Sequence, residues 1–414
     1  MSTARRRASC ACALAVAGVA IAAAASAEAG TIFRGPAYKT ASAPTAHKPQ
    51  SKIWFAGGRW WSVMWNAQAY TYRIYRLDRA KHAWVSTKLA LDTRRDSHAD
   101  VASTGRTAMV ASAAPPGTRD KDRRILLWKL TLRGDTWVRS GKPVAPALAT
   151  PEAVVLDEDS TGTIWIAYTD DNGGGGRRVL VTHSTTDTRH FTAPAPLGVD
   201  GSDDLSDDDL VAVAAYGDRV GLLWNNQTRG SFVFASRPAG STTTTWVGQP
   251  VFQGTYLSDD HLSLKSPHDG SSRLFALVKT SLNDERSSPD AAQMLLLALG
   301  DDGAWHSYPV WSIADHVTRP LLLLAPSRNV ALVFATSPCC SGGVVYEKTA
   351  SMTAPAFAPG LGTPFLHTPQ DTKLNNPTST KQPLDARRGV VVVASDDSTR
   401  TYATGVAPLP PAVP

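Results

Sequence analysis

Residues 293–305 read QMLLLALGDDGAW, which is an apolar run of strand length, a short polar turn and a tryptophan. The same arrangement recurs along the chain. An aromatic residue follows a polar turn at six places that lie 52 to 59 residues apart: Trp84, Trp137, Phe191, Trp246, Trp305 and Phe357. Because an apolar run of strand length precedes each of them, each pair predicts a β-hairpin.

Two further apolar runs lie upstream of each hairpin. Before the hairpin at Trp305 they are residues 262–267 (LSLKSP) and residues 273–280 (RLFALVKT). Each repeat therefore predicts four short strands in about 54 residues, a period typical of radially repeated sheets. A β-helix would have far shorter repeats, and a helical solenoid would show a 3.6-residue period that these runs lack.

The two ends of the chain indicate how the repeats close. The seventh repeat begins near Asn375, with its first strand expected at residues 378–384, and no aromatic stands where its fourth strand would fall. Residues 31–33 supply a spare strand at the other end, which fits a closed ring but not two stacked sandwiches. We therefore expect an all-β fold, a single seven-bladed β-propeller over residues 31–409, closed by an N-terminal strand that completes the last blade. Six or eight blades are the alternatives.

Residues 1–27 have the layout of a secretory signal peptide. Arg5, Arg6 and Arg7 precede an Ala-rich run at 11–25 that is short for a membrane span, and small residues follow it. We expect an exported protein, secreted or periplasmic, without membrane insertion. Cleavage after Ala27 would remove three of the 42 basic residues and none of the 36 acidic ones, so the net charge falls from +6 to +3. So weak an excess argues against nucleic acid as a partner, and we expect a monomer.

The polar turns before the aromatics resemble a degenerate Asp-box (S-x-D-x-G-x-x-W). The best copies are GDDGAW at 300–305 and RGDTW at 133–137. Phe33-Arg34-Gly35-Pro36 is similar to the FRIP segment of sialidases. The chain thus resembles secreted sialidase-like propellers with BNR repeats over most of its length. Many such proteins are carbohydrate-active enzymes or carbohydrate binders, so the resemblance implies a glycan ligand.

Polar residues that lead into the first strand of each repeat have similar offsets from the hairpin aromatics. Similar offsets imply similar places, so we expect these residues to surround one mouth of the central channel: His47, His98, Glu152, Asp208, His261, His316 and Asn376. Any single one of them has the alternative explanation that polar residues begin strands. Four of the seven are nevertheless histidines, in a chain that has only ten.

Charged residues inside the expected strands add to this predicted site. They are Lys265, Lys279, Arg319 and Lys381. A charge within an apolar run is costly unless it is paired or faces a wet cavity. These groups would bind an anionic ligand together with Asn375 and Asn376. Alternatively, they form a structural network with Asp259, Asp260 and Asp396.

These residues predict an exported protein that acts on an acidic glycan at the central funnel, as a polysaccharide lyase or an exo-acting glycosidase. A lyase needs cations that neutralise a uronate carboxylate and a base for the C5 proton. Cations at positions 265, 319 and 381 would neutralise, and His261, His98 or His316 would be the base. Glu152 and Asp208 would serve as the carboxylates of a glycosidase. The alternative is a noncatalytic propeller that binds a carbohydrate or another partner.

Cys339 and Cys340 are adjacent, and they are the two cysteines that remain after cleavage. In an exported protein we expect them to form a vicinal disulfide, a stiff apolar plate against which a sugar ring can pack. Free thiols and a purely structural kink are the alternatives.

No cofactor motif stands out in the sequence. Six aspartates in residues 200–209 offer oxygen ligands for calcium, but their spacing fits no EF-hand, and a solvated loop is the preferred interpretation. HExxH and GxSxG motifs are absent, so a zinc centre or a serine triad has no support. We expect no cofactor, with calcium as the one alternative.

Overall fold

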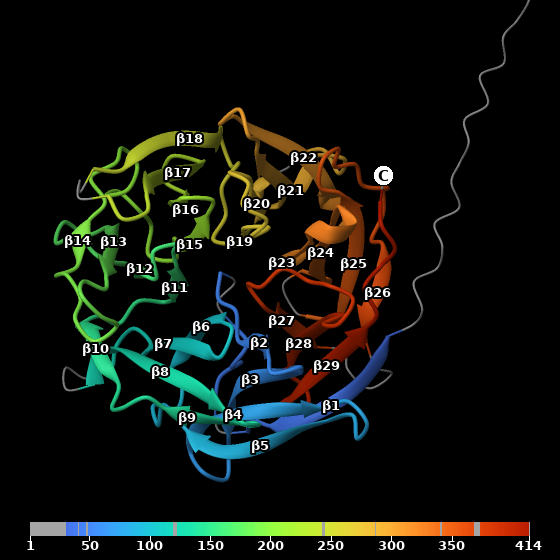
Figure 1. The fold of residues 1–414 in the computed structure, drawn as a ribbon. Helices are drawn as coiled ribbons and strands as arrows, with labels where there is room; N and C mark the ends of the chain where they lie inside the picture. The colour runs from blue at the N-terminus through green and yellow to red at the C-terminus, as the bar shows by residue number, and fades with distance from the viewer. Residues whose placement is uncertain are drawn as a thin grey trace, which may run out of the picture.

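The computed structural model describes residues 30–39, 41–46, 49–118, 122–241, 245–285, 287–339, 342–367 and 373–413. Within these residues, seven antiparallel sheets stand as blades around one axis (Figure 1). The predicted seven-bladed β-propeller is confirmed. Residues 1–27 lie outside the described residues, so the signal peptide stays a prediction. Among the described residues, no helix is both long and apolar enough to cross a membrane.

The blades follow one another along the chain, each with its first strand nearest the axis (Figure 1). Blade one contains β2 (Ile53–Ala56), β3 (Arg59–Asn66), β4 (Thr71–Asp78) and β5 (Ala83–Ala90). Blade two contains β6 (His98–Thr104), β7 (Thr107–Ala113), β8 (Ile125–Arg133), β9 (Thr136–Arg139) and β10 (Val144–Ala147). Blade three contains β11 (Val154–Glu158), β12 (Ile164–Asp171), β13 (Arg177–His183) and β14 (Ala195–Pro196). Blade four contains β15 (Val211–Tyr216), β16 (Arg219–Asn226), β17 (Ser231–Pro238) and β18 (Val247–Gln253).

The remaining blades keep this order. Blade five contains β19 (Leu262–Lys265), β20 (Leu274–Lys279), β21 (Ala292–Leu299) and β22 (Trp305–Ser312). Blade six contains β23 (Thr318–Ala325), β24 (Val330–Ser337), β25 (Val344–Ser351) and β26 (Thr363–Leu366). Blade seven contains β27 (Leu374–Thr378), β28 (Val390–Asp396), β29 (Thr401–Ala407) and, from the N-terminus, β1 (Thr31–Ala37). Short 3-10 helices also lie between strands of the described residues, among them η2 (Leu282–Asp284), η3 (Ile313–Asp315) and η4 (Pro326–Arg328).

The N-terminal strand closes the ring as expected. β1 pairs antiparallel with β29, and Phe33 lies opposite Thr404. This pairing covers the strand edge that the C-terminal blade would otherwise expose. Arg34 lies on this outermost strand opposite Ala403, three strands away from the axis. The arginine of the FRIP-like segment is therefore remote from the channel.

The repeated aromatics explain the period, because three of the tryptophans pack against the preceding blade. The ring of Trp137 lies 5.7 Å from that of Trp54, measured between centroids, and Trp246 lies 5.7 Å from Trp165. Trp305 lies 5.2 Å from Phe234 in the same way. These edge-to-face contacts fill the apolar layer between neighbouring blades. At each of these three interfaces, one large aromatic of the repeat therefore holds a blade to the one before it.

The expected first strand of blade seven was wrong. We expected residues 378–384, whereas β27 spans Leu374–Thr378 and pairs with β28, with Asn375 opposite Ser395. The sequence Asn375-Asn376-Pro377 looks like a turn because it is polar and contains proline. It forms a strand nonetheless, because at the axis its polar side chains need not enter an apolar layer and a register shift accommodates the proline. Lys381 consequently lies in the connection after the strand and not within it.

Candidate functional site

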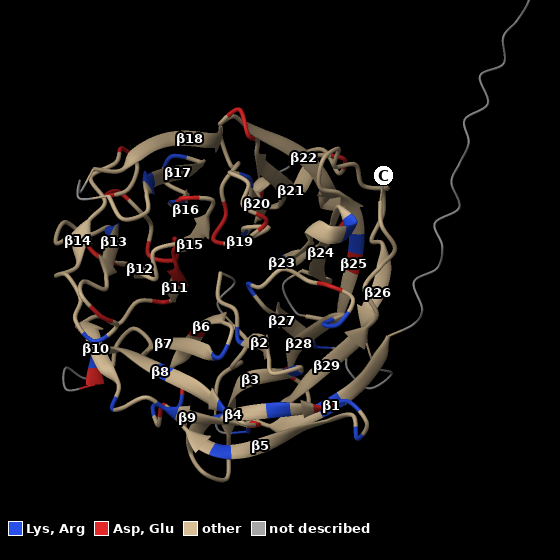
Figure 2. Cartoon of the chain, viewed as in Figure 1, with Lys and Arg blue, Asp and Glu red and all other residues tan. Residues whose placement is uncertain are grey.

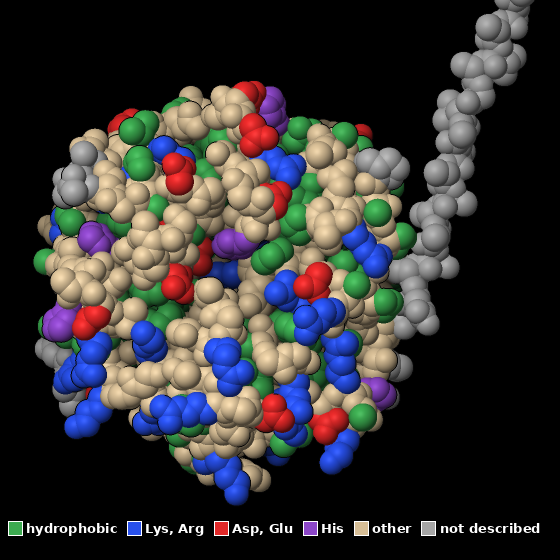
Figure 3. Space-filling model, viewed as in Figure 1, with side chains coloured by type: hydrophobic (Ala, Val, Ile, Leu, Met, Phe, Trp, Pro, Cys, Tyr) green, Lys and Arg blue, Asp and Glu red, His purple; other side chains and the backbone are tan. Residues whose placement is uncertain are grey.

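The axis of the ring opens on the face that Figure 3 shows. A hollow lies at the centre of that face, with a histidine and several acidic and basic side chains around it (Figure 3). Figure 2 shows that charged residues also gather beside the inner strands, in the interior of the ring. Two groups of these residues make extensive contacts with one another.

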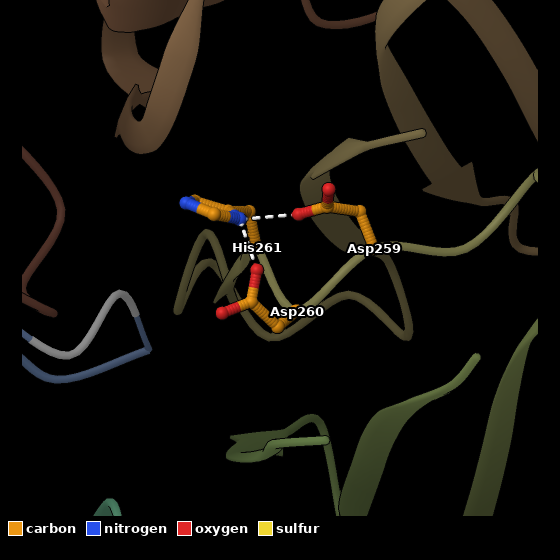
Figure 4. A group of neighbouring side chains, drawn as sticks. All are labelled: Asp259, Asp260 and His261. Atoms are coloured by element: carbon orange, nitrogen blue, oxygen red, sulfur yellow. Dashed lines mark hydrogen bonds and ion pairs between the residues drawn. The ribbon is translucent and has the colours of Figure 1, made fainter. Parts of the chain in front are cut away.

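His261 is the centre of the first group and directly precedes β19. Its Nδ1 nitrogen contacts the carboxylates of Asp259 and Asp260, the two residues before it (Figure 4). Its Nε2 nitrogen lies 2.7 Å from Nη1 of Arg319 and 3.3 Å from the hydroxyl of Thr318. Only 7% of His261 is exposed. The side chains of blades five and six therefore meet at this imidazole.

The partners of His261 determine its tautomer. Ionised carboxylates only accept hydrogen bonds, and a guanidinium only donates them. Nδ1 therefore carries the proton and donates to Asp259 and Asp260, while Nε2 keeps its lone pair and accepts from Arg319. This is the arrangement of a histidine that a carboxylate orients so that the opposite nitrogen acts as a base.

Backbone strain places Arg319 in this site. Its φ angle is +60° although Pro320 follows it, and the register between β23 and β24 shifts between Thr318 and Leu321. Asn376 repeats this conformation in blade seven, with a φ of +54° before a proline and a register shift. A residue before proline disfavours such angles, and each strained position costs about 1–3 kcal/mol. Strain at equivalent positions of two neighbouring blades is typical of a functional site.

Lys279 forms an ion pair with one carboxylate of this group. Its Nζ lies 2.5 Å from Oδ2 of Asp259 and 3.1 Å from Oδ1 of Asn283, and only 3% of the residue is exposed. The ion-pair alternative is therefore correct for Lys279. It holds Asp259 in place, and it is too buried to contact a ligand.

Lys265 and Lys381 belong to a second group, which contacts Ser51 and Asp100. Nζ of Lys265 lies 2.9 Å from the hydroxyl of Ser51, and Nζ of Lys381 lies 2.5 Å from Oδ2 of Asp100. Asp100 also accepts hydrogen bonds from the backbone of Ser51 at 2.7 Å and of Leu156 at 2.8 Å. The partners of both lysines form a network that joins blades one, two, three, five and seven, and the binding of an anionic ligand by these lysines stays a prediction.

Residues 50–52, just before β2, form the middle of this network. Gln50 donates from Nε2 to the carbonyl of Val154 at 2.7 Å, and Lys52 donates to Gln50 and to the carbonyl of Ala99. The segment appears in blue near the axis in Figure 1. Burial lowers the pKa of Lys52 and of Lys265 to about 7. We call Gln50, Ser51, Lys52, Asp100, Lys265 and Lys381 the axial network.

The other predicted site residues are spread over the same end of the ring. His98 is buried at the start of β6 opposite Ala113, and Glu152 is half-buried before β11. His316 is exposed after η3, and its carbonyl accepts a hydrogen bond from the backbone of Cys339 at 2.6 Å. Asn375 is buried in β27. His47 and Cys340 lie outside the described residues, so the vicinal disulfide stays a prediction.

The acidic loop at residues 200–209 is largely engaged with the protein. Arg229 forms ion pairs with Asp200 and Asp204, and exposed Asp208 accepts a hydrogen bond from Gln227. Asp209, which the sequence analysis did not select, is fully buried, and burial raises the pKa of its carboxyl to about 7. The sequence does not distinguish Asp209 from its neighbours, because it is one of three consecutive aspartates.

Thr318 and Asp100 were also missed. Asp100 carries the same signal as Lys265, a charge within an apolar inner strand, and that signal could have found it. Asp259, Asp260 and His261 together offer atoms within 4.8 Å of one another, a spacing that suits a metal ion. Lys279 and Arg319 already place two cationic groups against this set, so a metal ion would have to displace them.

Comparisons with known proteins identify the fold and no family. No family model matches the chain, and no curated protein matches it. The structure is similar to the BP39L lectin from Burkholderia pseudomallei, with 12% identity over 87% of this chain and 97% of that one and a TM-score of 0.55. It is also similar to a polysaccharide lyase of family PL25, an ulvan lyase, with 8% identity over 89% of this chain and 94% of that one and a TM-score of 0.56. A Trypanosoma rangeli sialidase mutant matches over 69% of this chain and 52% of its own, at 11% identity and a TM-score of 0.44.

Proposed function

We propose that this protein is an exported polysaccharide lyase that cleaves a uronate-containing glycan at the His261 site. The observation that carries the proposal is the contact between Nε2 of His261 and the guanidinium of Arg319. Elimination from a uronate requires a cation on the carboxylate and a base for the neighbouring proton. Both groups are present here at one place, 2.7 Å apart.

The chemistry follows from the tautomer. A uronate carboxylate would take the guanidinium of Arg319 away from the imidazole, which frees the lone pair on Nε2. That nitrogen removes the C5 proton, the C–H electron pair forms the C4–C5 double bond, and the bond between C4 and the glycosidic oxygen breaks. The departing oxygen takes a proton from water, and His261 later releases its own to water. Asp259 and Asp260 stabilise the imidazolium that forms in between.

A glycosidase is less well supported. Two carboxyl groups that act as acid and base would have to flank the bond. Asp259 is engaged by Lys279 and His261, and Asp208 and Glu152 belong to the connections into other blades. The fold-level likeness to a PL25 polysaccharide lyase agrees with the lyase proposal without testing it.

A noncatalytic glycan-binding propeller is the second candidate. The observation in its favour is the burial of His261, whose Nε2 already has a partner. The fold-level likeness to the BP39L lectin is compatible with this alternative. The two candidates differ in turnover alone, since both would place the glycan over Arg319.

The distinguishing experiment uses the mature protein and a panel of uronate polysaccharides. We expect the wild type to generate unsaturated products, which the ultraviolet absorbance of the new double bond reports. His261→Ala should lose that activity and retain binding. Binding without any unsaturated product from the wild type would favour the noncatalytic alternative.

A further inference from the structure

A polar pocket of about 760 Å³ opens beside the His261 site, between blades four and five. Its walls are the loop after β16, the connection from β18 to β19 and the segment after β20, and its lining includes Gln227, Tyr256, Ser258, Ser281 and Asp284. The hydroxyl of Ser281 donates to the carbonyl of Ser258 at 3.0 Å and lies 3.5 Å from Oδ2 of Asp259. A residue of the pocket lining therefore contacts the carboxylate that orients His261.

Tyr256 presents an aromatic ring to this pocket. Tyr256 is 44% exposed, and its backbone is left-handed, with a φ of +60°. Its carbonyl accepts a hydrogen bond from the backbone of Ser281 at 2.9 Å, and a hydrogen bond to Glu285 raises the pKa of its hydroxyl. The ring is thus exposed, and the backbone that carries it is held by a hydrogen bond. An exposed aromatic ring offers its face to the C–H groups of a sugar.

The opposite wall offers amide groups. Nε2 of Gln227 donates to Asp208 at 2.8 Å and to buried Asp209 at 3.1 Å, which turns its Oε1 oxygen away from the two carboxylates. The two loops are joined by a hydrogen bond of 3.1 Å from the backbone of Gly254 to that of Gly230. A Cβ at Gly230 would lie 2.2 Å from the Gly254 oxygen, so this wall requires glycine there.

The charges around the pocket select against an anionic sugar. Asp284 lines it, Asp208 lies behind Gln227, and Glu285 lies beside Tyr256. Arg229, the basic residue of the lining, is already paired with Asp200 and Asp204. A carboxylate or sulfate in the pocket would meet these acidic groups, whereas hydroxyl groups can donate to them.

We propose that this pocket is a subsite for an uncharged sugar unit next to the uronate, and that the ligand is a polymer in which uronate alternates with an uncharged sugar. This inference rests on the proposed function for the place of the uronate. It excludes uronate homopolymers as the preferred ligand, and it makes Tyr256 the residue against which the uncharged sugar packs.

The test is titration calorimetry on a His261→Ala background, so that no turnover interferes. The probes are four hexasaccharides. Those of unsulfated chondroitin and of the rhamnogalacturonan I backbone alternate uronate with an uncharged sugar. Those of chondroitin sulfate and of polygalacturonate carry a charge where the other two have the uncharged sugar. We expect at least one alternating probe to bind at least about tenfold more tightly than both charged probes, and Tyr256→Ala to lose about tenfold in Kd for it. Tyr256→Phe keeps the ring and should stay within about threefold.

Binding that is equal for all four probes, binding that Tyr256→Ala leaves unchanged, or failure of all four probes to bind would overturn the subsite. A matched control is Tyr70→Ala, because Tyr70 is 59% exposed and lies in the loop between β3 and β4 of blade one. Calorimetry does not depend on turnover. A preference that depends on Tyr256 in a protein without lyase activity would therefore keep the subsite and contradict the proposed reaction.

Discussion

The guanidinium of Arg319 donates a hydrogen bond of 2.7 Å to Nε2 of His261 and so joins the inner ends of blades six and five. The carboxylates of Asp259 and Asp260 contact the other nitrogen of the imidazole and fix its proton on Nδ1. The backbone at Arg319 has a left-handed conformation, which positions the side chain for this contact. The proposed reaction depends on the contact between Arg319 and His261.

Substitution of Arg319 should impair catalysis strongly. We expect Arg319→Ala to lower kcat/KM on the responsive polysaccharide by about a hundredfold, because it removes the cation that stabilises the developing charge. Arg319→Lys should recover only part of this, since lysine lacks the planar fork that binds a carboxylate with two hydrogen bonds. Steady-state kinetics measures both, with exposed Arg387→Ala as the control. An Arg319→Ala variant with wild-type kinetics would remove Arg319 from the site.

The buried ion pair between Lys279 and Asp259 should be essential for stability. Lys279→Met leaves the Asp259 carboxylate without its amine, and we expect the free energy of unfolding to fall by about 3–5 kcal/mol. Asp259→Asn in addition should restore part of the loss, because no buried charge is then left unpaired. Urea unfolding of both single variants and the double variant gives the coupling energy. Strictly additive losses would mean that the two groups do not interact.

Stability should rise with pH just above neutrality because of Lys52 and Lys265. Burial lowers their pKa in the folded protein from 10.5 to about 7, so between these values the unfolded chain binds more protons than the folded one. The free energy of unfolding then rises by up to about 1.4 kcal/mol per pH unit for each lysine. Below pH 7 both states are protonated, and the contribution no longer changes.

Comparison with Lys52→Met isolates this effect from other groups. The raised pKa of Asp209 acts in the acidic range, and the raised pKa values of the buried tyrosines act above pH 10. We therefore expect the difference between wild type and Lys52→Met to change with pH between 7 and 9. Thermal unfolding across this range measures it, and a difference that stays constant would show that Lys52 titrates normally.

Trp137 should be one of the residues that hold blade one to blade two. Its ring is 1% exposed and packs against Trp54 and Trp61. We expect Trp137→Ala to lower the free energy of unfolding by about 3–5 kcal/mol, since it leaves a cavity between the blades. Val247→Ala, at a position that is 70% exposed, should change it by less than about 0.5 kcal/mol. Chemical denaturation checks this, and equal effects would contradict the role of the repeated aromatics.

The fold could be predicted because the apolar gap between neighbouring blades recurs once in every repeat. Trp137, Trp246 and Trp305 recur at a fixed period since each fills one gap between blades, and a period survives in the sequence even where the motif does not. The closing strand at Phe33 followed from the same count. β27 was misplaced because Asn376 and Pro377 have the composition of a turn, and only the tertiary pairing with β28 makes them a strand.

The sequence selected two residues that the structure brings into contact, His261 at the start of one inner strand and Arg319 within the next. Their role in a site stays a prediction. Lys265 shows the same signal, yet it bonds Ser51 in the axial network. A charge that faces a ligand and a charge that crosses the axis to another blade look the same along one strand. Their separation depends on contacts between residues more than 200 positions apart.

The most direct test of the proposed reaction is the ultraviolet absorbance of the mature protein incubated with uronate polysaccharides. The proposed mechanism predicts a new unsaturated product from at least one alternating polymer, and none from the same polymer with His261→Ala, which should still bind it. Wild-type protein that binds such a polymer and forms no unsaturated product, or a His261→Ala variant that cleaves as fast as wild type, would contradict it.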